Sequence, residues 1–281
     1  MKTYFSSLGT VALTALAVIS TLVSCQDTDY PTPQPATGPS TVQARALFVH
    51  AAPGAPALNF LVNNEQAGQA RSFGEATGYN AFGVGPAQFR ARGASGPIGG
   101  VIGSNDILFR AGATNDNNFA AVANTAYTVF VTDTLNRPRP NVANGTNPGG
   151  PQFLVVTDNL AAPTAGNAHV RFFHLAPNVG PVSVRLRATG ATTDAATFLG
   201  RGYRAISSGT GATTVNFANF TPVPAGTYTV EVFTGGTITG TPVLTVPNVT
   251  LEQGKIVTLY ARGLNRGTGA TALSAGVVQH N

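Results

Sequence analysis

Hydrophobic and polar residues alternate with a period of two along much of this chain. Residues 182–187 (VSVRLR) show the pattern most clearly, and it is typical of a strand with one buried and one solvated face. Residues 226–233 and 255–261 are rich in β-branched and aromatic residues, and turn formers lie between such segments. Because no amphipathic helix follows residue 25, the pattern predicts an all-β protein made of antiparallel β-sandwiches, Ig-like or barrel-like.

The body of the chain repeats itself. Residues 44–53 (ARALFVHAAP) align with residues 168–177 (AHVRFFHLAP) at an offset of 124, which also places Tyr79 on Tyr203. We therefore predict two tandem sandwich domains, 44–160 and 167–281, with a joint at 161–167 (AAPTAGN). Since tandem sandwiches usually meet end to end, we expect that arrangement here.

The N-terminus is uncharged and apolar apart from Lys2, the one charge in the first 26 residues. The apolar run 8–23 ends in Leu22-Val23-Ser24-Cys25, which resembles the lipobox of bacterial lipoproteins, in which the cysteine thiol carries a diacylglycerol. Residues 5–24 are also long enough for a transmembrane anchor. The order of charged, apolar and small residues favours a signal peptide over 1–24, with lipid attached at Cys25.

Residues 25–43 follow as a lipidated N-terminus and an extended tether, with prolines at 31, 33, 35 and 39. At roughly 3.1 Å per residue such a tether lifts a domain about 50 Å from a bilayer. Gln26 favours outer-membrane sorting, and Asp27 and Asp29 resemble surface-export signals of Bacteroidota lipoproteins. We expect an exported protein in the cell envelope, on the periplasmic or surface face of the outer membrane.

The charge distribution argues against a nucleic-acid partner, and the cysteine content excludes disulfide bonds within the chain. Charged residues form 10% of the chain, and removal of residues 1–24 lowers the formal net charge from +5 to +4. The arginines are dispersed, so no basic run indicates nucleic-acid binding. Cys25 is the single cysteine, so no intramolecular disulfide can form.

Several segments of the second repeat together resemble the bacterial domain-of-unknown-function family numbered 4397. They are 171–177 (RFFHLAP), 182–184 (VSV), 224–230 (PAGTYTV) and 254–263, which opens with Gly254-Lys255 and ends with Ala261-Arg262-Gly263. The resemblance covers 44–159 and 167–281. It implies a secreted or lipid-anchored location and no established activity. The first repeat departs from it: Leu47 replaces Arg171, and 82–89 (FGVGPAQF) replaces the Pro-Ala-Gly-Thr-Tyr turn. Asn59 and Ser183 stand where many members carry aspartate.

His50 and His174 occupy the same place in both repeats, three residues before Pro53 and Pro177. Each histidine is a candidate metal ligand or general base. In neither repeat, however, does a second histidine or cysteine stand at the spacing that metal ligands need. We therefore expect structural imidazoles that bond local backbone, in two separate sites, and no bound metal or cofactor. Residues 112–118 (GATNDNN) offer oxygen ligands for calcium, yet one carboxylate favours a turn. Asp133-Thr134-Leu135 resembles an O-glycosylation motif, with Thr134 as acceptor.

The sequence contains no nucleophile elbow, zinc helix or phosphate loop. We predict a non-catalytic, lipid-anchored binding or display module, held on the membrane through Cys25, with a glycan or an envelope protein as partner. The alternatives are an envelope spacer without a specific ligand and a carbohydrate-active hydrolase. Candidates for a binding surface are Arg185, Arg187, Tyr203 and Tyr228.

Overall fold

The computed structural model describes residues 42–95, 106–110, 118–138 and 149–281. The signal peptide, Cys25, the tether up to residue 41 and the candidate calcium ligands before Asn118 lie outside these residues. Residues 42–281 form one compact unit. No helix in the described ranges has the length and apolar character needed to cross a membrane.

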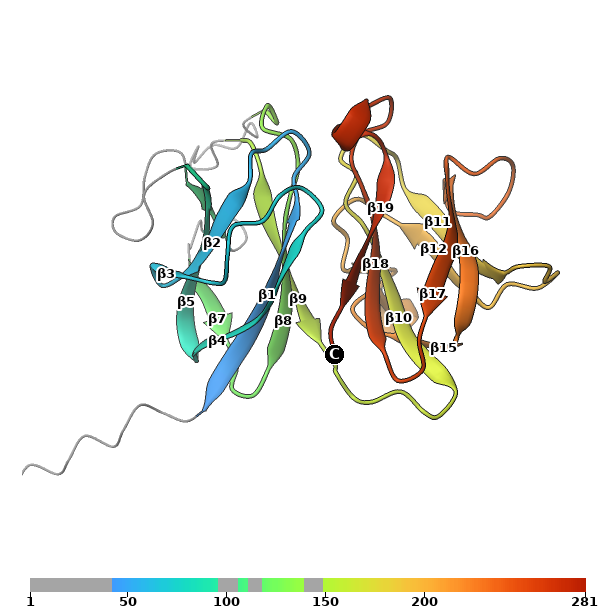
Figure 1. The fold of residues 1–281 in the computed structure, drawn as a ribbon, viewed down its shortest axis with the longest axis horizontal. Coiled ribbons are helices and arrows are strands. Elements are labelled where there is room, and N and C mark those ends of the chain that lie inside the picture. The colour runs from blue at the N-terminus through green and yellow to red at the C-terminus, as the bar shows by residue number, and fades with distance from the viewer. Residues whose placement is uncertain (1–41, 96–105, 111–117, 139–148) are drawn as a thin grey trace, which may run out of the picture. The chain divides into compact units, whose positions relative to one another are not determined.

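The first half of this unit contains two layers of strands (Figure 1). One sheet has the order β4-β1-β8-β9, and the other has the order β3-β2-β5-β6, with β7 also paired to β5. The strands of the first sheet are β1 (Gln43–Ala51), β4 (Ala76–Gly83), β8 (Ala126–Thr132) and β9 (Gln152–Asp158). Those of the second are β2 (Leu58–Val62), β3 (Glu65–Gln66), β5 (Gly85–Gly93), β6 (Ile107–Leu108) and β7 (Asn118–Ala121).

The second half repeats this plan. Its sheets have the orders β15-β10-β18-β19 and β12-β11-β16-β17, beside a small β13-β14 hairpin. The strands of the first sheet are β10 (Asn167–His174), β15 (Thr221–Pro224), β18 (Ile256–Arg262) and β19 (Ser274–Gln279). The others are β11 (Val182–Ala188), β12 (Ala196–Arg201), β13 (Ser207–Ser208), β14 (Val215–Asn216), β16 (Gly226–Thr234) and β17 (Leu244–Leu251), with short 3-10 turns at Gly211–Thr213 and Gly269–Thr271. The all-β prediction, with two strand-rich halves, is confirmed.

One pairing in each half differs from a purely antiparallel sheet. β1 runs parallel to β8, and β10 runs parallel to β18, while the other pairings between strands are antiparallel. The period of two reports which side chains share a face and carries no information about strand direction. The β4-β1-β8-β9 and β15-β10-β18-β19 sheets are therefore mixed, and the other sheets are antiparallel.

Three clusters of buried apolar side chains hold the unit together. Two lie inside the halves, and each fills the space between that half's sheets. The third joins the halves: Leu47 and Val49 of β1 and Phe130 of β8 pack with Phe173 of β10 and Tyr260 of β18. The β4-β1-β8-β9 and β15-β10-β18-β19 sheets thus pack face to face, and the expectation of end-to-end contact was wrong. Since β1 and β8 are covered on both faces, they carry near-continuous apolar runs.

Candidate functional site

His50 and His174 lie at the ends of β1 and β10 and are almost completely buried. The Nε2 of His50 lies 2.9 Å from the carbonyl oxygen of Pro56, and the Nε2 of His174 lies 3.1 Å from that of Val179. Each Nδ1 accepts a hydrogen bond from the backbone N–H two residues later. This pattern assigns both rings a neutral form with the proton on Nε2. Burial lowers the pKa of both imidazoles.

The structure corrects one correspondence between the repeats. Tyr203 packs edge-on against His174, with ring centroids 5.9 Å apart, and Phe73 packs in the same way against His50 at 6.0 Å. The equivalent of Tyr203 is thus Phe73, whereas Tyr79 lies on β4. The offset of 124 fails here because the segments that follow β2 and β11 differ in length.

The four predicted binding residues do not form one surface. Arg185 and Arg187 lie on β11, where Arg185 Nε donates to Glu231 at 2.6 Å and Arg187 pairs with Asp194 at 2.7 Å. Tyr228 is 4% exposed, packs in the core of the second half and donates to the Pro224 carbonyl. The hydroxyl of Tyr203 is buried. Tyr228 faces the core of the second half, and the Tyr203 ring packs against His174, so these two tyrosines do not build an exposed aromatic patch.

A buried polar ring that the sequence analysis missed lies between the two halves. Arg171 of β10 donates from Nη2 to Asp158 of β9 at 2.5 Å and from Nε to Thr258 of β18 at 2.8 Å. His280 Nε2 lies 2.7 Å from the Thr258 hydroxyl, and its Nδ1 lies 2.8 Å from the Tyr79 hydroxyl. Tyr79 donates to the other oxygen of Asp158 at 2.7 Å and closes the ring.

Burial favours a neutral His280 in this ring, because it lowers the pKa of the imidazole to about 4 from 6.5. Tyr79 donates to Asp158, so its oxygen accepts from the Nδ1–H of His280. In the neutral imidazole, Nε2 then accepts from the Thr258 hydroxyl. Arg171 and Asp158 are the charged pair, and each is at most 7% exposed. The buried Arg171–Asp158 pair makes the ring a structural contact between the halves.

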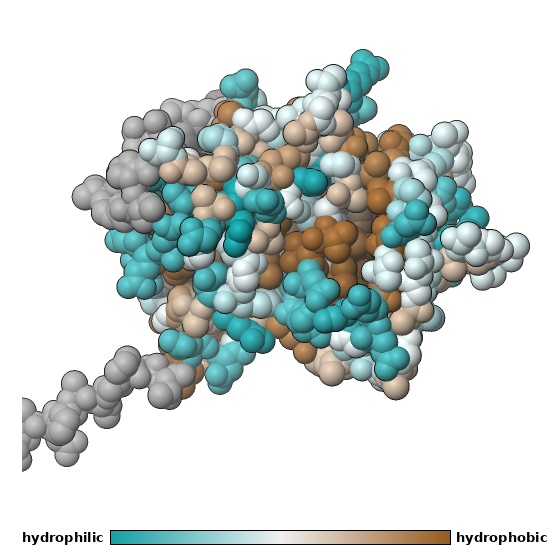
Figure 2. All heavy atoms as spheres, viewed as in Figure 1, coloured by the Kyte–Doolittle hydropathy of each residue, from teal (hydrophilic) through white to brown (hydrophobic). Residues whose placement is uncertain are grey.

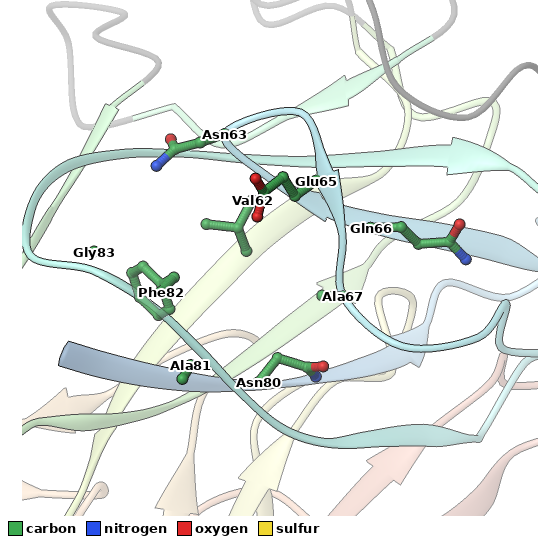
Figure 3. A pocket seen from close by; sticks show the side chains of 9 residues that line it. All are labelled: Val62, Asn63, Glu65, Gln66, Ala67, Asn80, Ala81, Phe82 and Gly83. Atoms are coloured by element: carbon green, nitrogen blue, oxygen red, sulfur yellow. The ribbon is translucent and has the colours of Figure 1, made fainter. Parts of the chain in front are cut away.

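An accessible pocket lies in the first half, between the β2–β3 hairpin and the edge of β4 (Figure 3). Its volume is about 370 Å³, and it is lined by Val62, Asn63, Glu65, Gln66, Ala67, Asn80, Ala81, Phe82 and Gly83. The hairpin turns through Asn63 and Asn64, both with positive φ, as a tight two-residue hairpin requires. Polar side chains surround β3 at the surface, whereas apolar ones gather near β18 and β19 (Figure 2).

The floor and rim of this pocket differ in character. Val62, Ala67 and Phe82 are at most 8% exposed and give an apolar floor. At the rim, Gln66 donates to Asn59 and Asn80 donates to the Gly78 carbonyl, which leaves Glu65 as the charged group. Within the described ranges, Glu65 has no cationic partner. The pocket can therefore hold an apolar group next to a cation. Sequence alone did not indicate it, because its residues come from two different sheets.

The described residues contain no group of three histidine, cysteine or acidic side chains that could hold a metal ion.

Comparison with known proteins gives one result. The family described as "Domain of unknown function (DUF4397)" matches residues 44–185, just over half of the chain. The match covers the first half and continues into β11 of the second. No curated protein matches the chain. The chain belongs to the DUF4397 family.

Proposed function

We propose that this protein is a non-catalytic binding or display module, held on a membrane of the cell envelope by a lipid on Cys25. The observation that carries the proposal is the Leu22-Val23-Ser24-Cys25 motif at the end of an uncharged apolar run, with no other cysteine in the chain. The Pro-rich residues that follow give the module reach from the bilayer. The pocket beside β4 is its candidate ligand site.

The use of carboxylates supports a role without catalysis. Of the eight acidic side chains in the described ranges, five pair with arginine: Asp106, Asp133, Asp158, Asp194 and Glu231. Glu75 accepts a hydrogen bond from the Ser72 backbone. Glycoside hydrolysis needs two carboxylates that flank one bond. The remaining pair, Glu65 and Glu252, belongs to different halves, which disfavours the hydrolase alternative.

We also propose that the second half is a second copy of the DUF4397 domain. The equal strand order of the two halves and the equivalent positions of His50 and His174 support this assignment. A tandem of two copies that share one buried interface would present the pocket on a rigid base.

Lipid labelling tests the anchor. Cells that express the protein are grown with a radiolabelled fatty acid, and the membrane and soluble fractions are separated. The wild type should be labelled and membrane-bound, whereas Cys25→Ala should lose both properties. Ser24→Ala, which keeps a small residue before the cysteine, is the matched control and should behave as wild type. Labelling of Cys25→Ala would refute the lipid site, and an unlabelled Cys25→Ala that stays in the membrane would indicate a transmembrane anchor.

A further inference from the structure

The two halves have equivalent edge strands that differ in one respect. Among the strands that the structure describes, β4 pairs only with β1 and β15 pairs only with β10, so each has one free edge. On β1, Arg45 lies opposite Ala81, and on β10 the equivalent His169 lies opposite Pro222. Two residues further along the edge, Gly83 of β4 corresponds to Pro224 of β15.

The register shows which backbone groups point away from the β4 sheet. Arg45 donates its N–H to Thr125, on the β8 side of β1. Backbone groups alternate in direction along a strand, so the residue opposite Arg45, Ala81, directs its N–H and C=O outward, as do Tyr79 and Gly83. No residue within the described ranges bonds to these outward groups of Ala81 and Gly83. The edge therefore presents free donors and acceptors.

In the second half, prolines block the addition of a strand to the corresponding edge of β15. His169 donates to Lys255 on the β18 side, so the outward positions of β15 are those of Pro222 and Pro224. Proline has no N–H to offer, and its presence at outward edge positions is a common way to prevent strand addition. β4 carries no proline and no charged residue over its eight positions. The first half thus lacks the protection that the second half has.

The pocket lies directly beside this open edge. Phe82 and Asn80 pair with Ala44 and Ala46, whose side chains face the core between the two sheets, so Phe82 and Asn80 face the same way. Both line the pocket, together with Glu65 of β3. Alternate residues of a strand added to β4 would point toward the pocket floor and toward the Glu65 carboxylate.

We propose that the free edge of β4 binds an extended peptide segment of a partner protein, with an apolar side chain in the pocket and a lysine or arginine beside Glu65. This inference deepens the proposed binding role and rests on it. Charge complementarity with Glu65, which has no cationic partner among the described residues, selects a basic segment. The chain's own residues 26–41 are poorly suited, because prolines at 31, 33, 35 and 39 cannot donate along a ladder.

A titration followed by NMR tests this directly. The probe is the acetylated and amidated peptide TVTKTVT, added to the isotope-labelled full-length protein in detergent micelles. The valines and the lysine of this peptide share one face. The backbone amides of Ala81 and Gly83 should shift on titration, and those of β15 should not. The peptide TVTETVT, with glutamate in place of lysine, should bind about tenfold more weakly or worse.

Variants separate strand pairing from other contacts. Ala81→Pro copies the edge of β15 and removes one outward N–H, so peptide affinity should fall about tenfold or more. Ala81→Val keeps that N–H and should bind as wild type. Glu65→Gln should abolish the preference for TVTKTVT over TVTETVT. Because Ala81→Pro could perturb folding, TVTKTVT methylated on alternate backbone nitrogens gives a second test on the unaltered protein: one of the two methylation registers should eliminate binding.

The proposal would be overturned by any of these results: no amide shifts at millimolar peptide, equal binding by Ala81→Pro and Ala81→Val, or equal binding of both methylated peptides. Concentration-dependent shifts of the same amides without peptide, together with a dimer in sedimentation, would assign the edge to a second copy instead and would also overturn it. Lipid labelling at Cys25 is independent of these readouts, so a failed titration with normal labelling would reject the peptide site and leave the anchored module intact.

Discussion

Arg171 of β10 and Asp158 of β9 form an ion pair of 2.5 Å between the two halves of the protein, with both side chains fully buried. The guanidinium also contacts the Thr128 and Thr258 hydroxyls, one from each half. It lies over the ring of Phe220 at 4.4 Å. A buried charge pair is tolerated when its remaining donors and acceptors are satisfied. This contact therefore requires that the halves dock in one register.

Replacement of Arg171 should be strongly destabilising. Arg171→Leu, which introduces the residue found at the equivalent position 47, would leave Asp158 buried without a cation. We expect the free energy of unfolding to fall by about 3–5 kcal/mol, measured by urea denaturation. The double variant Arg171→Leu/Asp158→Leu should recover part of this loss. The partly exposed pair of Arg187 on β11 and Asp194 supplies a control, since Arg187→Leu should cost about 1 kcal/mol or less. Equal losses for Arg171→Leu and Arg187→Leu would contradict the role assigned to the buried pair.

Stability should decline when the pH falls below about 6.5. Burial depresses the pKa of His280 to about 4, so the unfolded chain binds a proton there that the folded chain does not. Between pH 6.5 and 4 this difference lowers the free energy of unfolding as the pH decreases, by about 3 kcal/mol in total for this group. His50 and His174 have lowered pKa values and act in the same direction.

Urea denaturation of the wild type and of His280→Gln at several pH values measures the contribution of His280. The variant should show a shallower dependence of stability on pH in this window, whatever its stability at pH 7. Parallel pH profiles for the two proteins would show that the ring does not hold His280 neutral.

His50 and His174 should contribute to stability separately. His50→Ala and His174→Ala each remove a buried ring that bonds local backbone on both nitrogens, so each should cost roughly 1–3 kcal/mol. Because the two rings have no common partner, the losses should add within about 0.5 kcal/mol in the double variant. A strongly non-additive double variant, or a melting temperature raised by added zinc and insensitive in either single variant, would indicate one shared site.

The alternation of apolar and polar residues was sufficient to predict the all-β class, and the repeat of 44–53 in 168–177 placed the two histidines at equivalent positions. The face-to-face docking could not be predicted, because a period of two describes one strand at a time. The apolar run around Phe48 is compatible with burial on both faces, but it does not identify what covers the second face. Leu47 departs from the family pattern that Arg171 follows, but the sequence does not reveal the partner of Arg171. Asp158 lies on β9, whose place in the sheet depends on the parallel pairing of β1 and β8.

The pocket and the open edge also could not be predicted from the sequence, because both depend on the pairing register of the strands. Pro224 was visible in the sequence as part of the Pro-Ala-Gly-Thr-Tyr turn, and Pro222 stands two residues before it. Their outward position emerges only from the pairing of β15 with β10. Likewise Glu65 looks like an ordinary exposed acid until β3 is placed beside β4.

The central claim is that both halves form one cooperative unit across the buried interface of Leu47, Phe130, Phe173 and Tyr260 and the ring around Arg171. Differential scanning calorimetry of the protein tests it most directly. We predict a single unfolding transition with a ratio of calorimetric to van't Hoff enthalpy of about 1. Two resolved transitions, or a ratio near 2 with halves that melt independently, would contradict the claim.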